Sequence, residues 1–269
     1  MRTFVCGAVA YDPKVVTIWE GFRAWFAEHG FDFDFVLYSN YERQVAAHFD
    51  GAFDVAWNSP LAWVQARRRA LREGISCRAV AMRDTDRDLR SVVVVRADGP
   101  TSLSELNGRR VGVGALDSPQ ATLIPVHCLI EAGVNARITR FDALLGKHGD
   151  HIGGERDAAR ALVRGDLDAA CIIDGNLGLF TREGTFPPGS VRVLHETPAY
   201  DHCNMTVLGD GHPATERFVQ LLLGMSWDDP VVRPLLEMEG LRRWLPGRTQ
   251  GYVTLEAAVD RFGDPAIVG

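Results

Sequence analysis

The stretch that decides the fold runs from Val111 to Leu123, Val-Gly-Val-Gly-Ala-Leu-Asp-Ser-Pro-Gln-Ala-Thr-Leu. A short apolar run is followed by a polar turn and then by residues typical of a helix start. Asp117 or Ser118 can cap this helix, and Pro119 suits its first turn, where an N–H group is not needed. The pattern predicts a strand that delivers a helix N-terminus to the edge of a sheet. Unpaired N–H groups and the helix dipole favour an anion there, although most such corners bind no ligand.

Strands alternate with helices on both sides of this stretch. Apolar runs predict strands at residues 3–10, 31–37, 51–57, 77–82 and 91–96 upstream, and at 136–141, 167–173 and 191–195 downstream. Helical periodicity fills the gaps between the first four of these runs. The alternation indicates an α/β fold made of right-handed strand–helix–strand units around mainly parallel sheets flanked by helices.

The composition bounds the possible functions. The 269 residues are 46% hydrophobic and 24% charged, which suits one large or two medium domains with a sizeable core. A net charge of -6 without a basic stripe argues against a nucleic-acid partner. No stretch approaches the ~20 apolar residues needed to cross a bilayer, so we expect no membrane insertion. Nucleotide-binding, hydrolase and metalloprotease motifs are absent from the sequence.

The N-terminus and the cysteines bear on localisation. Charged and aromatic residues follow the apolar run Met1–Ala10 at once, so it is too short for a signal peptide. Five cysteines, an odd number with no CxxC pair, fit a reducing compartment better than a disulfide framework. As the sequence stands we expect a cytoplasmic protein, and a periplasmic or extracellular one only if a leader has been removed.

Three segments carry a resemblance to a known family. Residues 102–114 (SLSELNGRRVGVG) resemble the entry to the second lobe of type II periplasmic binding proteins. Residues 51–60 (GAFDVAWNSP) are similar to a strand and ligand-lining turn of these proteins, and residues 160–170 (RALVRGDLDAA) resemble a later helix–strand motif. Within that superfamily, residues 3–245 look most like the phosphate/phosphonate substrate-binding proteins of ABC transporters.

This resemblance implies a two-lobed type II periplasmic-binding-protein fold with two hinge crossovers, near Val95–Asp98 and His195–Tyr200. Lobe one would comprise residues 1–96 and 200–245, lobe two residues 97–199, and the tail 246–269 would pack on lobe one. A small-molecule ligand would lie in a cleft at the carboxyl ends of the strands, and the lobes would close on it by a hinge. An ABC permease would be the partner if the chain is exported.

The resemblance also implies a set of ligand-binding residues. In lobe one they are Ala10, Tyr11, Asn58 and Ser59, and in lobe two they are Ser118, Gln120, Ala121, Glu155 and Asp174. The polar stretch Tyr200–Asn204 beside the second crossover adds His202 as a further ligand-binding candidate. Ser118 keeps the hydroxyl with which the family holds an oxyanion, whereas Gln120 and Ala121 depart from it. Glu155 falls where the family has a histidine, and Asp174 lies near a position that often faces a ligand amine.

These departures leave the ligand open. Losing hydroxyls and gaining a carboxylate both weaken a site for a tetrahedral dianion, because like charges in a closed site repel. The ligand is therefore expected to be a small polar or anionic molecule: a phosphonate, a zwitterion, a carboxylate or a neutral heterocycle.

Two other functions stay open. One is a cytosolic enzyme resembling, at fold level, the synthases of thiamin pyrimidine or menaquinone precursors, with His202, Cys203 and Glu155 as acid–base groups or ligands. The other is an intracellular ligand sensor that signals through a partner. Imidazole and thiolate groups of His148, His151 and Cys203 are candidate ligands for Zn²⁺ or Fe²⁺. Solvated loop histidines and a packed cysteine explain the same residues without metal. The sequence identifies no cofactor.

Overall fold

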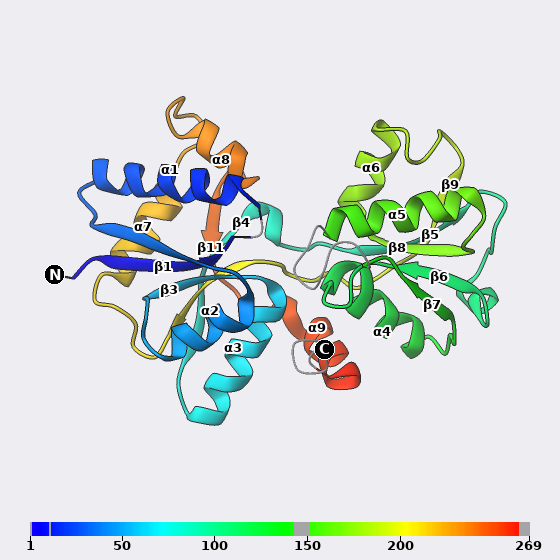
Figure 1. Ribbon diagram of the computed structural model, residues 1–269, viewed down its shortest axis with the longest axis horizontal. Coiled ribbons are helices and arrows are strands. Elements are labelled where there is room, and N and C mark those ends of the chain that lie inside the picture. The colour runs from blue at the N-terminus through cyan, green and yellow to red at the C-terminus, as the bar shows by residue number, and fades with distance from the viewer. Residues whose placement is uncertain (1, 11, 143–150, 264–269) are drawn as a thin grey trace. The chain divides into compact units, whose positions relative to one another are not determined.

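The computed structural model describes residues 2–10, 12–142 and 151–263, which divide into two compact units (Figure 1). Unit one comprises Met1–Arg87 and Asp201–Tyr252, and unit two comprises Asp88–Tyr200 and Val253–Gly269. The chain therefore passes between the units after Arg87 and after Tyr200, and once more after Tyr252. The first crossover was expected near Val95–Asp98, but it precedes residues 91–96, which form a strand of unit two.

Unit one is a six-stranded sheet with the order β11-β4-β10-β3-β1-β2. Its strands are β1 (Phe4–Val9), β2 (Phe33–Tyr38), β3 (Val55–Asn58), β4 (Cys77–Arg83), β10 (Asn204–Leu208) and β11 (Trp244–Pro246). Its helices are α1 (Lys14–Glu28), α2 (Tyr41–Phe49), α3 (Pro60–Glu73), α7 (Thr215–Gly224) and α8 (Arg233–Glu239), with short 3₁₀ turns η1 (Asp84–Asp86) and η4 (Gln250–Tyr252).

Helices cover both faces of this sheet, with α1, α7 and α8 along one face and α2 and α3 along the other (Figure 1). The larger core is aromatic: Phe26 of α1 lies 4.6 Å from Phe33 and 5.4 Å from Phe218, measured between ring centroids. Helix α3 begins and ends at residues that are common at helix termini. Ser59 caps it, Pro60 opens it, and Gly74 ends it at a φ of 68°.

Unit two is a five-stranded sheet with the order β7-β6-β8-β5-β9. Its strands are β5 (Ser91–Arg96), β6 (Arg110–Val113), β7 (Arg137–Arg140), β8 (Ala169–Ile173) and β9 (Val191–Glu196). Its helices are α4 (Ile124–Glu131), α5 (His151–Arg164), α6 (Asp174–Arg182) and α9 (Val253–Phe262), with the 3₁₀ turn η2 (Leu103–Leu106) and the π-helical turn η3 (Pro119–Leu123).

The four valines of β5, Val92–Val95, show why this sheet is buried on both faces. The even-numbered pair packs in a core with Leu162 of α5, and the odd-numbered pair packs in another core with Leu129 of α4. Side chains alternate between the faces of a strand, so an unbroken valine run needs an apolar layer on each side.

The predicted α/β fold is confirmed, with one refinement of strand direction. Strands β1, β2 and β3 are parallel, as are β6, β7 and β8. Strand β10 is antiparallel to β3 and β4, and β5 is antiparallel to β8 and β9. Each of these two strands is the first after the chain passes into its unit, so it enters the sheet from the opposite direction.

The C-terminal segment corrects the expectation that residues 246–269 pack on lobe one. Residues 246–252 belong to unit one, but α9 belongs to unit two, where it contacts α4 and where Arg261 pairs with Glu131. Leu255, Ala258 and Val259 form the apolar face that α9 buries, at the spacing of one helix side.

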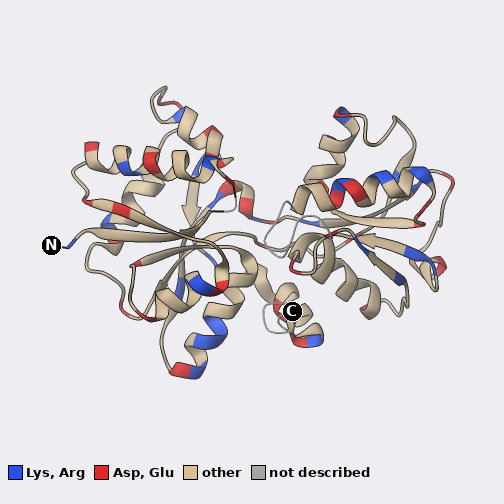
Figure 2. Cartoon of the chain, in the orientation of Figure 1, with Lys and Arg blue, Asp and Glu red and all other residues tan. Residues whose placement is uncertain are grey.

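The distribution of charged residues and the hydropathy of the helices agree with what the composition of the sequence predicts. Basic and acidic residues are interspersed along the helices of both units (Figure 2). A search of the described residues finds no helix with the length and apolar character that a membrane span requires.

Candidate functional site

Unit one brings several predicted residues to one edge of its sheet. Parallel β1 and β3 end there, and Asn204 at the start of antiparallel β10 lies opposite Asn58. Ala10 is exposed, Ser59 is half-buried, and the predicted ligand residue Tyr11 lies outside the described residues. The Ser59 hydroxyl accepts a hydrogen bond from the Ala62 N–H at 3.2 Å, which is a helix cap.

Asn58 is buried in a chain of side-chain hydrogen bonds. Its Nδ2 donates to Thr206 Oγ1 at 2.8 Å, and its Oδ1 accepts from Gln44 Nε2 at 3.0 Å. Asn204 continues the chain by donating to the Tyr252 hydroxyl at 2.8 Å, which in turn donates to the His202 carbonyl oxygen at 2.8 Å. In unit one, Asn58 therefore ties β3 to β10, and Asn204 ties β10 to the end of η4.

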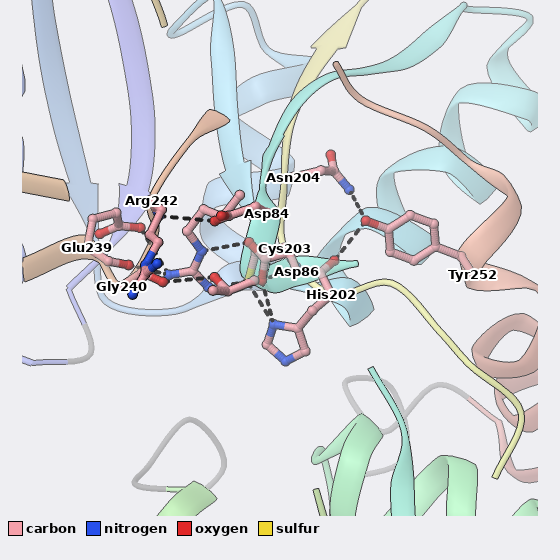
Figure 3. A network of polar contacts seen from close by, with 11 residues as sticks. Asp84, Asp86, His202, Cys203, Asn204, Glu239, Gly240, Arg242 and Tyr252 are labelled. Carbon is pink, nitrogen blue, oxygen red and sulfur yellow. Dashed lines mark hydrogen bonds and ion pairs between the residues drawn. The ribbon is translucent and has the colours of Figure 1, made fainter. Parts of the chain in front are cut away.

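A charged cluster lies beside His202 (Figure 3). Arg83 donates from Nε to Asp86 Oδ2 at 2.6 Å and from Nη2 to Oδ1 at 2.9 Å, and its Nη1 donates to the Glu239 carbonyl oxygen at 2.7 Å. Nδ1 of His202 lies 3.4 Å from Asp86 Oδ1. Burial alone would raise the pKa of Asp86, but the Arg83 guanidinium and His202 hold it well below its usual range.

Cys203 lies in the same cluster, with its Sγ 3.1 Å from His202 Nδ1. One ring nitrogen thus faces both the thiol and Asp86, whereas a catalytic relay uses opposite ring nitrogens for nucleophile and carboxylate. Burial and the nearby Asp86 raise the pKa of the Cys203 thiol well above its usual value, so the thiol stays protonated. This arrangement does not activate a nucleophile.

The same three residues form the one metal-ligating trio found among the described residues. Ligand atoms of Asp86, His202 and Cys203 lie within 4.8 Å of one another. Arg83, however, already donates to both Asp86 oxygens, so its positive charge opposes a second cation there. Arg83 and Asp86 were missed by sequence reasoning, because the stretch 83–90 (RDTDRDLR) has the composition of an exposed loop.

Unit two assembles a second polar cluster at the carboxyl ends of β6 and β8. Ser118 is buried and caps η3, with its Oγ accepting from the Ala121 N–H at 3.1 Å. Ala121 is also buried. Gln120 is buried, and its carbonyl oxygen accepts a hydrogen bond from the Ser91 hydroxyl.

Glu155 is the most deeply buried acidic residue of this cluster, with no exposed surface. Its Oε2 accepts from the Ile173 N–H at 2.9 Å and from Asn176 Nδ2 at 2.8 Å. Its Oε1, like Oε1 of Gln120, is buried without a hydrogen-bond partner among the described residues. Burial raises the pKa of Glu155 to about 7, against the opposing effects of the Ile173 and Asn176 hydrogen bonds, the charge of His151 and the nearby Gln120 side chain.

The remaining candidates lie around this cluster. Asp174 begins α6, is exposed and accepts from the Gly175 N–H at 2.7 Å. His151 begins α5 with its Nε2 3.4 Å from Asp117 Oδ1, and the metal candidate His148 falls outside the described residues. Sequence reasoning missed Tyr200, whose hydroxyl lies 2.9 Å from Ser91 Oγ. Ser91 is the first residue of the otherwise apolar strand β5, so nothing in the sequence indicates a polar contact there.

Two α/β units that share one chain, each a sheet covered by helices on both faces, agree with the fold of periplasmic binding proteins. The sequence profile described as "ABC transporter, phosphonate, periplasmic substrate-binding protein" matches residues 8–252. The chain belongs to this family of ABC-transporter substrate-binding proteins. No curated protein matches the sequence.

Solved structures show the same fold at low identity. PhnD1 from Prochlorococcus marinus in complex with methylphosphonate has a TM-score of 0.68 at 18% identity, over 97% of this chain and 98% of that one. XAC2383 from Xanthomonas citri bound to ATP has a TM-score of 0.69 at 17% identity, over 97% and 98%. The aliphatic sulphonate binding protein SsuA from Escherichia coli has a TM-score of 0.58 at 15% identity, over 99% and 88%.

Proposed function

We propose that this protein holds a small oxyanion, phosphonate-like or sulfonate-like, with the polar cluster of unit two, and delivers it to an ABC permease. The observation that carries the proposal is the pair of buried oxygens, Oε1 of Glu155 and Oε1 of Gln120, that lack a partner among the described residues. Buried polar atoms are almost always paired, so such atoms mark a place where a bound molecule supplies the partner. Because an amide oxygen and an ionised carboxylate oxygen are acceptors, that molecule must carry a donor, such as the O–H of a phosphonate monoanion, or Glu155 must be protonated and donate to it.

The surroundings of these oxygens favour an anion. Helices α5 and α6 begin at His151 and Asp174, and the turn η3 begins at Pro119 and leads into α4. Glu155 on α5 is hydrogen-bonded to Ile173 and Asn176 at the start of α6, so these helix starts lie close together. Helix N-termini present partial positive charge. The similar structures bound to methylphosphonate and to ATP carry ligands of this kind.

Thermal-shift and calorimetric titrations at pH 5.5 with methylphosphonate, methanesulfonate, phosphate and ATP test this proposal. We expect at least one of them to raise the melting temperature in a concentration-dependent way, because a ligand that binds only the folded state stabilises it by mass action. Gln120→Ala should weaken that binding, and Gln250→Ala, at an exposed glutamine of unit one, should not. A flat response to all four compounds contradicts the proposal.

Family membership also supports the permease as a partner and a place of action outside the cytoplasm. Co-purification of the tagged protein with a permease, dependent on the ligand found in the titrations, tests this part. A protein that stays in the cytoplasm and captures no permease would contradict it.

A further inference from the structure

The peptide group between Gln120 and Ala121, in the turn η3, is held on both sides by serine hydroxyls. Its carbonyl oxygen accepts a hydrogen bond from the Ser91 hydroxyl, and its N–H donates to Ser118 Oγ at 3.1 Å. All four residues are buried. Ser118 is the N-cap of η3 itself, whereas Ser91 is the first residue of strand β5. The orientation of this peptide therefore depends on a residue that lies outside the turn.

Tyr200 supports Ser91 in this contact. The Tyr200 hydroxyl lies 2.9 Å from Ser91 Oγ. A serine hydroxyl has a single proton, and the Gln120 carbonyl oxygen, which can only accept, already takes it. Tyr200 must therefore donate to Ser91, and it keeps the proton to do so because burial raises its pKa. The hydrogen bonds thus run in one direction, from Tyr200 through Ser91 to the backbone of Gln120.

The backbone of Tyr200 is itself fixed at the boundary of unit two. Tyr200 is the last residue of this unit before the chain passes to unit one. The Leu89 N–H donates to the Tyr200 carbonyl oxygen at 2.9 Å, and the Tyr200 N–H donates to the Leu89 carbonyl oxygen at 2.8 Å. Leu89 follows the crossover at Arg87 closely. The three-residue chain therefore connects the turn η3 to the place where the polypeptide enters and leaves unit two.

We propose that Tyr200 and Ser91 are positioning residues of the oxyanion site: they do not touch the ligand, but they hold the Gln120–Ala121 peptide in the orientation that binding requires. This inference rests on the proposed function, because it concerns the same cluster of unit two.

Gln120 is the residue through which this positioning acts. Its Oε1 is buried without a partner among the described residues, and its side chain is close enough to Glu155 to lower the pKa of that residue. A rotation of the peptide would move this side chain and would also break the Ser118 cap. Binding groups need supporting hydrogen bonds of this kind, because small misplacements cost affinity. The bond from Tyr200 polarises the Ser91 hydroxyl and so strengthens its bond to Gln120.

The test is a double-variant cycle, measured by calorimetric titration at pH 5.5 with methylphosphonate, methanesulfonate, phosphate and ATP. Tyr200→Phe keeps the ring and removes only the hydroxyl, so affinity should fall by about three- to tenfold, which corresponds to one hydrogen bond. Ser91→Ala should lower affinity at least as much, because it also leaves the Gln120 carbonyl oxygen without its donor. The double variant should bind no more weakly than Ser91→Ala, since Tyr200 acts through Ser91.

Tyr252→Phe is the matched control. Tyr252 is also a fully buried tyrosine, and its hydroxyl joins the Asn204 amide to the His202 carbonyl oxygen, but it lies in unit one. Its loss should lower the melting temperature about as much as Tyr200→Phe does and leave ligand affinity unchanged. Equal losses of affinity in the two variants would overturn the positioning role, because the removal of any buried hydroxyl would then weaken binding.

Amide hydrogen exchange in the protein without ligand adds a measurement that does not depend on the titrations. The Ala121 N–H should exchange faster in Tyr200→Phe and in Ser91→Ala than in the unmodified protein, whereas Tyr252→Phe should leave its rate unchanged. A merely structural role of Tyr200 would lower the melting temperature without this local effect.

The outcomes separate this inference from the proposed function. If none of the four compounds binds the unmodified protein, the proposed function fails and the positioning role fails with it. If a compound binds, but Tyr200→Phe has the affinity or the Ala121 exchange rate of the unmodified protein, the positioning role is overturned and the oxyanion site stands. Additive losses of affinity in the double variant overturn it as well, because Tyr200 would then act independently of Ser91.

Discussion

Asp86 in unit one and Glu155 in unit two are both buried carboxyl groups, and their pKa values are shifted in opposite directions. The pKa of Asp86 lies well below its usual range, although burial opposes this, because Arg83 binds both of its oxygens. Burial raises the pKa of Glu155 to about 7, where hydrogen bonds to one oxygen compensate only in part. Burial is common to both, so the difference comes from the partners of Asp86, the Arg83 guanidinium group first and His202 second.

Glu239 lies between these two cases. Its carboxylate meets the same guanidinium at a single contact of 3.3 Å, and burial still raises its pKa. What separates a carboxyl group that stabilises the structure from one left available for a ligand is thus how far nearby positive charge offsets the cost of burial. The depth of burial itself does not separate them. Asp86 belongs to the first kind, and we assign Glu155 to the second.

Replacing Arg83 should have the largest effect on stability. Arg83→Met leaves Asp86 and Glu239 buried without their cation, and breaking a buried pair by removing one partner costs about 3–5 kcal/mol. Urea denaturation at pH 7 should show this loss in the unfolding of unit one. The double variant Arg83→Met/Asp86→Asn should recover part of it, since it removes one orphaned charge. An Arg83→Met loss below about 1 kcal/mol would mean that Arg83 does not set the properties of Asp86.

Replacing Glu155 should raise the stability of the protein, whereas replacing Arg83 should lower it. The folded state keeps the Glu155 proton up to about pH 7, whereas the unfolded chain releases it near the usual glutamate pKa of 4.5. Stability of the unmodified protein should therefore fall as the pH rises through this window, by about 3 kcal/mol for a shift of this size. Glu155→Gln does not ionise, so at pH 8 it should be more stable than the unmodified protein by about that amount. Below about pH 4 the two should be equal.

Asp86 provides the contrasting control for this experiment. Its lowered pKa gives stability that is complete above the pKa of the unfolded chain and is lost as the pH falls through the folded pKa. Asp86→Asn should thus be destabilised at pH 7 and approach the unmodified protein in acid. If Glu155→Gln also lost stability at pH 8, Glu155 would be a compensated carboxyl group like Asp86.

Local patterns predicted most of the fold. The valine run of β5 predicted a strand buried on both faces, and the Ser118–Pro119 pair predicted a capped helical turn, because each depends only on residues next to it in the sequence. Helix α9 was predicted to pack on the wrong unit. Its apolar face shows that one side of the helix is buried, but the sequence does not show which element covers that side.

The candidate site was predictable only in part. Ser118 and Glu155 were found because the strand–turn–helix pattern and the resemblance point to the ends of β6 and β8. Arg83 and Asp86 were not, since a buried salt bridge between charged residues of a polar loop has no local signature. Asn58 shows the opposite error. Its place at a strand end favoured a ligand-binding role, but its side chain is hydrogen-bonded to Gln44 and Thr206, which are distant in the sequence.

The smallest effect is expected where an ion pair is exposed. Arg261 of α9 pairs with Glu131 of α4, but 40% and 57% of these side chains remain accessible to solvent. Water screens such a pair, and holding two long side chains in place costs entropy, so Arg261→Ala should lower stability by about 0.5 kcal/mol or less. Leu255→Ala on the same helix removes a buried side chain and should cost about 2–5 kcal/mol, which controls for the contribution of α9 itself. Urea denaturation in low and high salt separates the two, because only the Arg261 effect should disappear at high salt. An Arg261→Ala loss comparable with that of Arg83→Met would show that burial of an ion pair does not govern its strength in this protein.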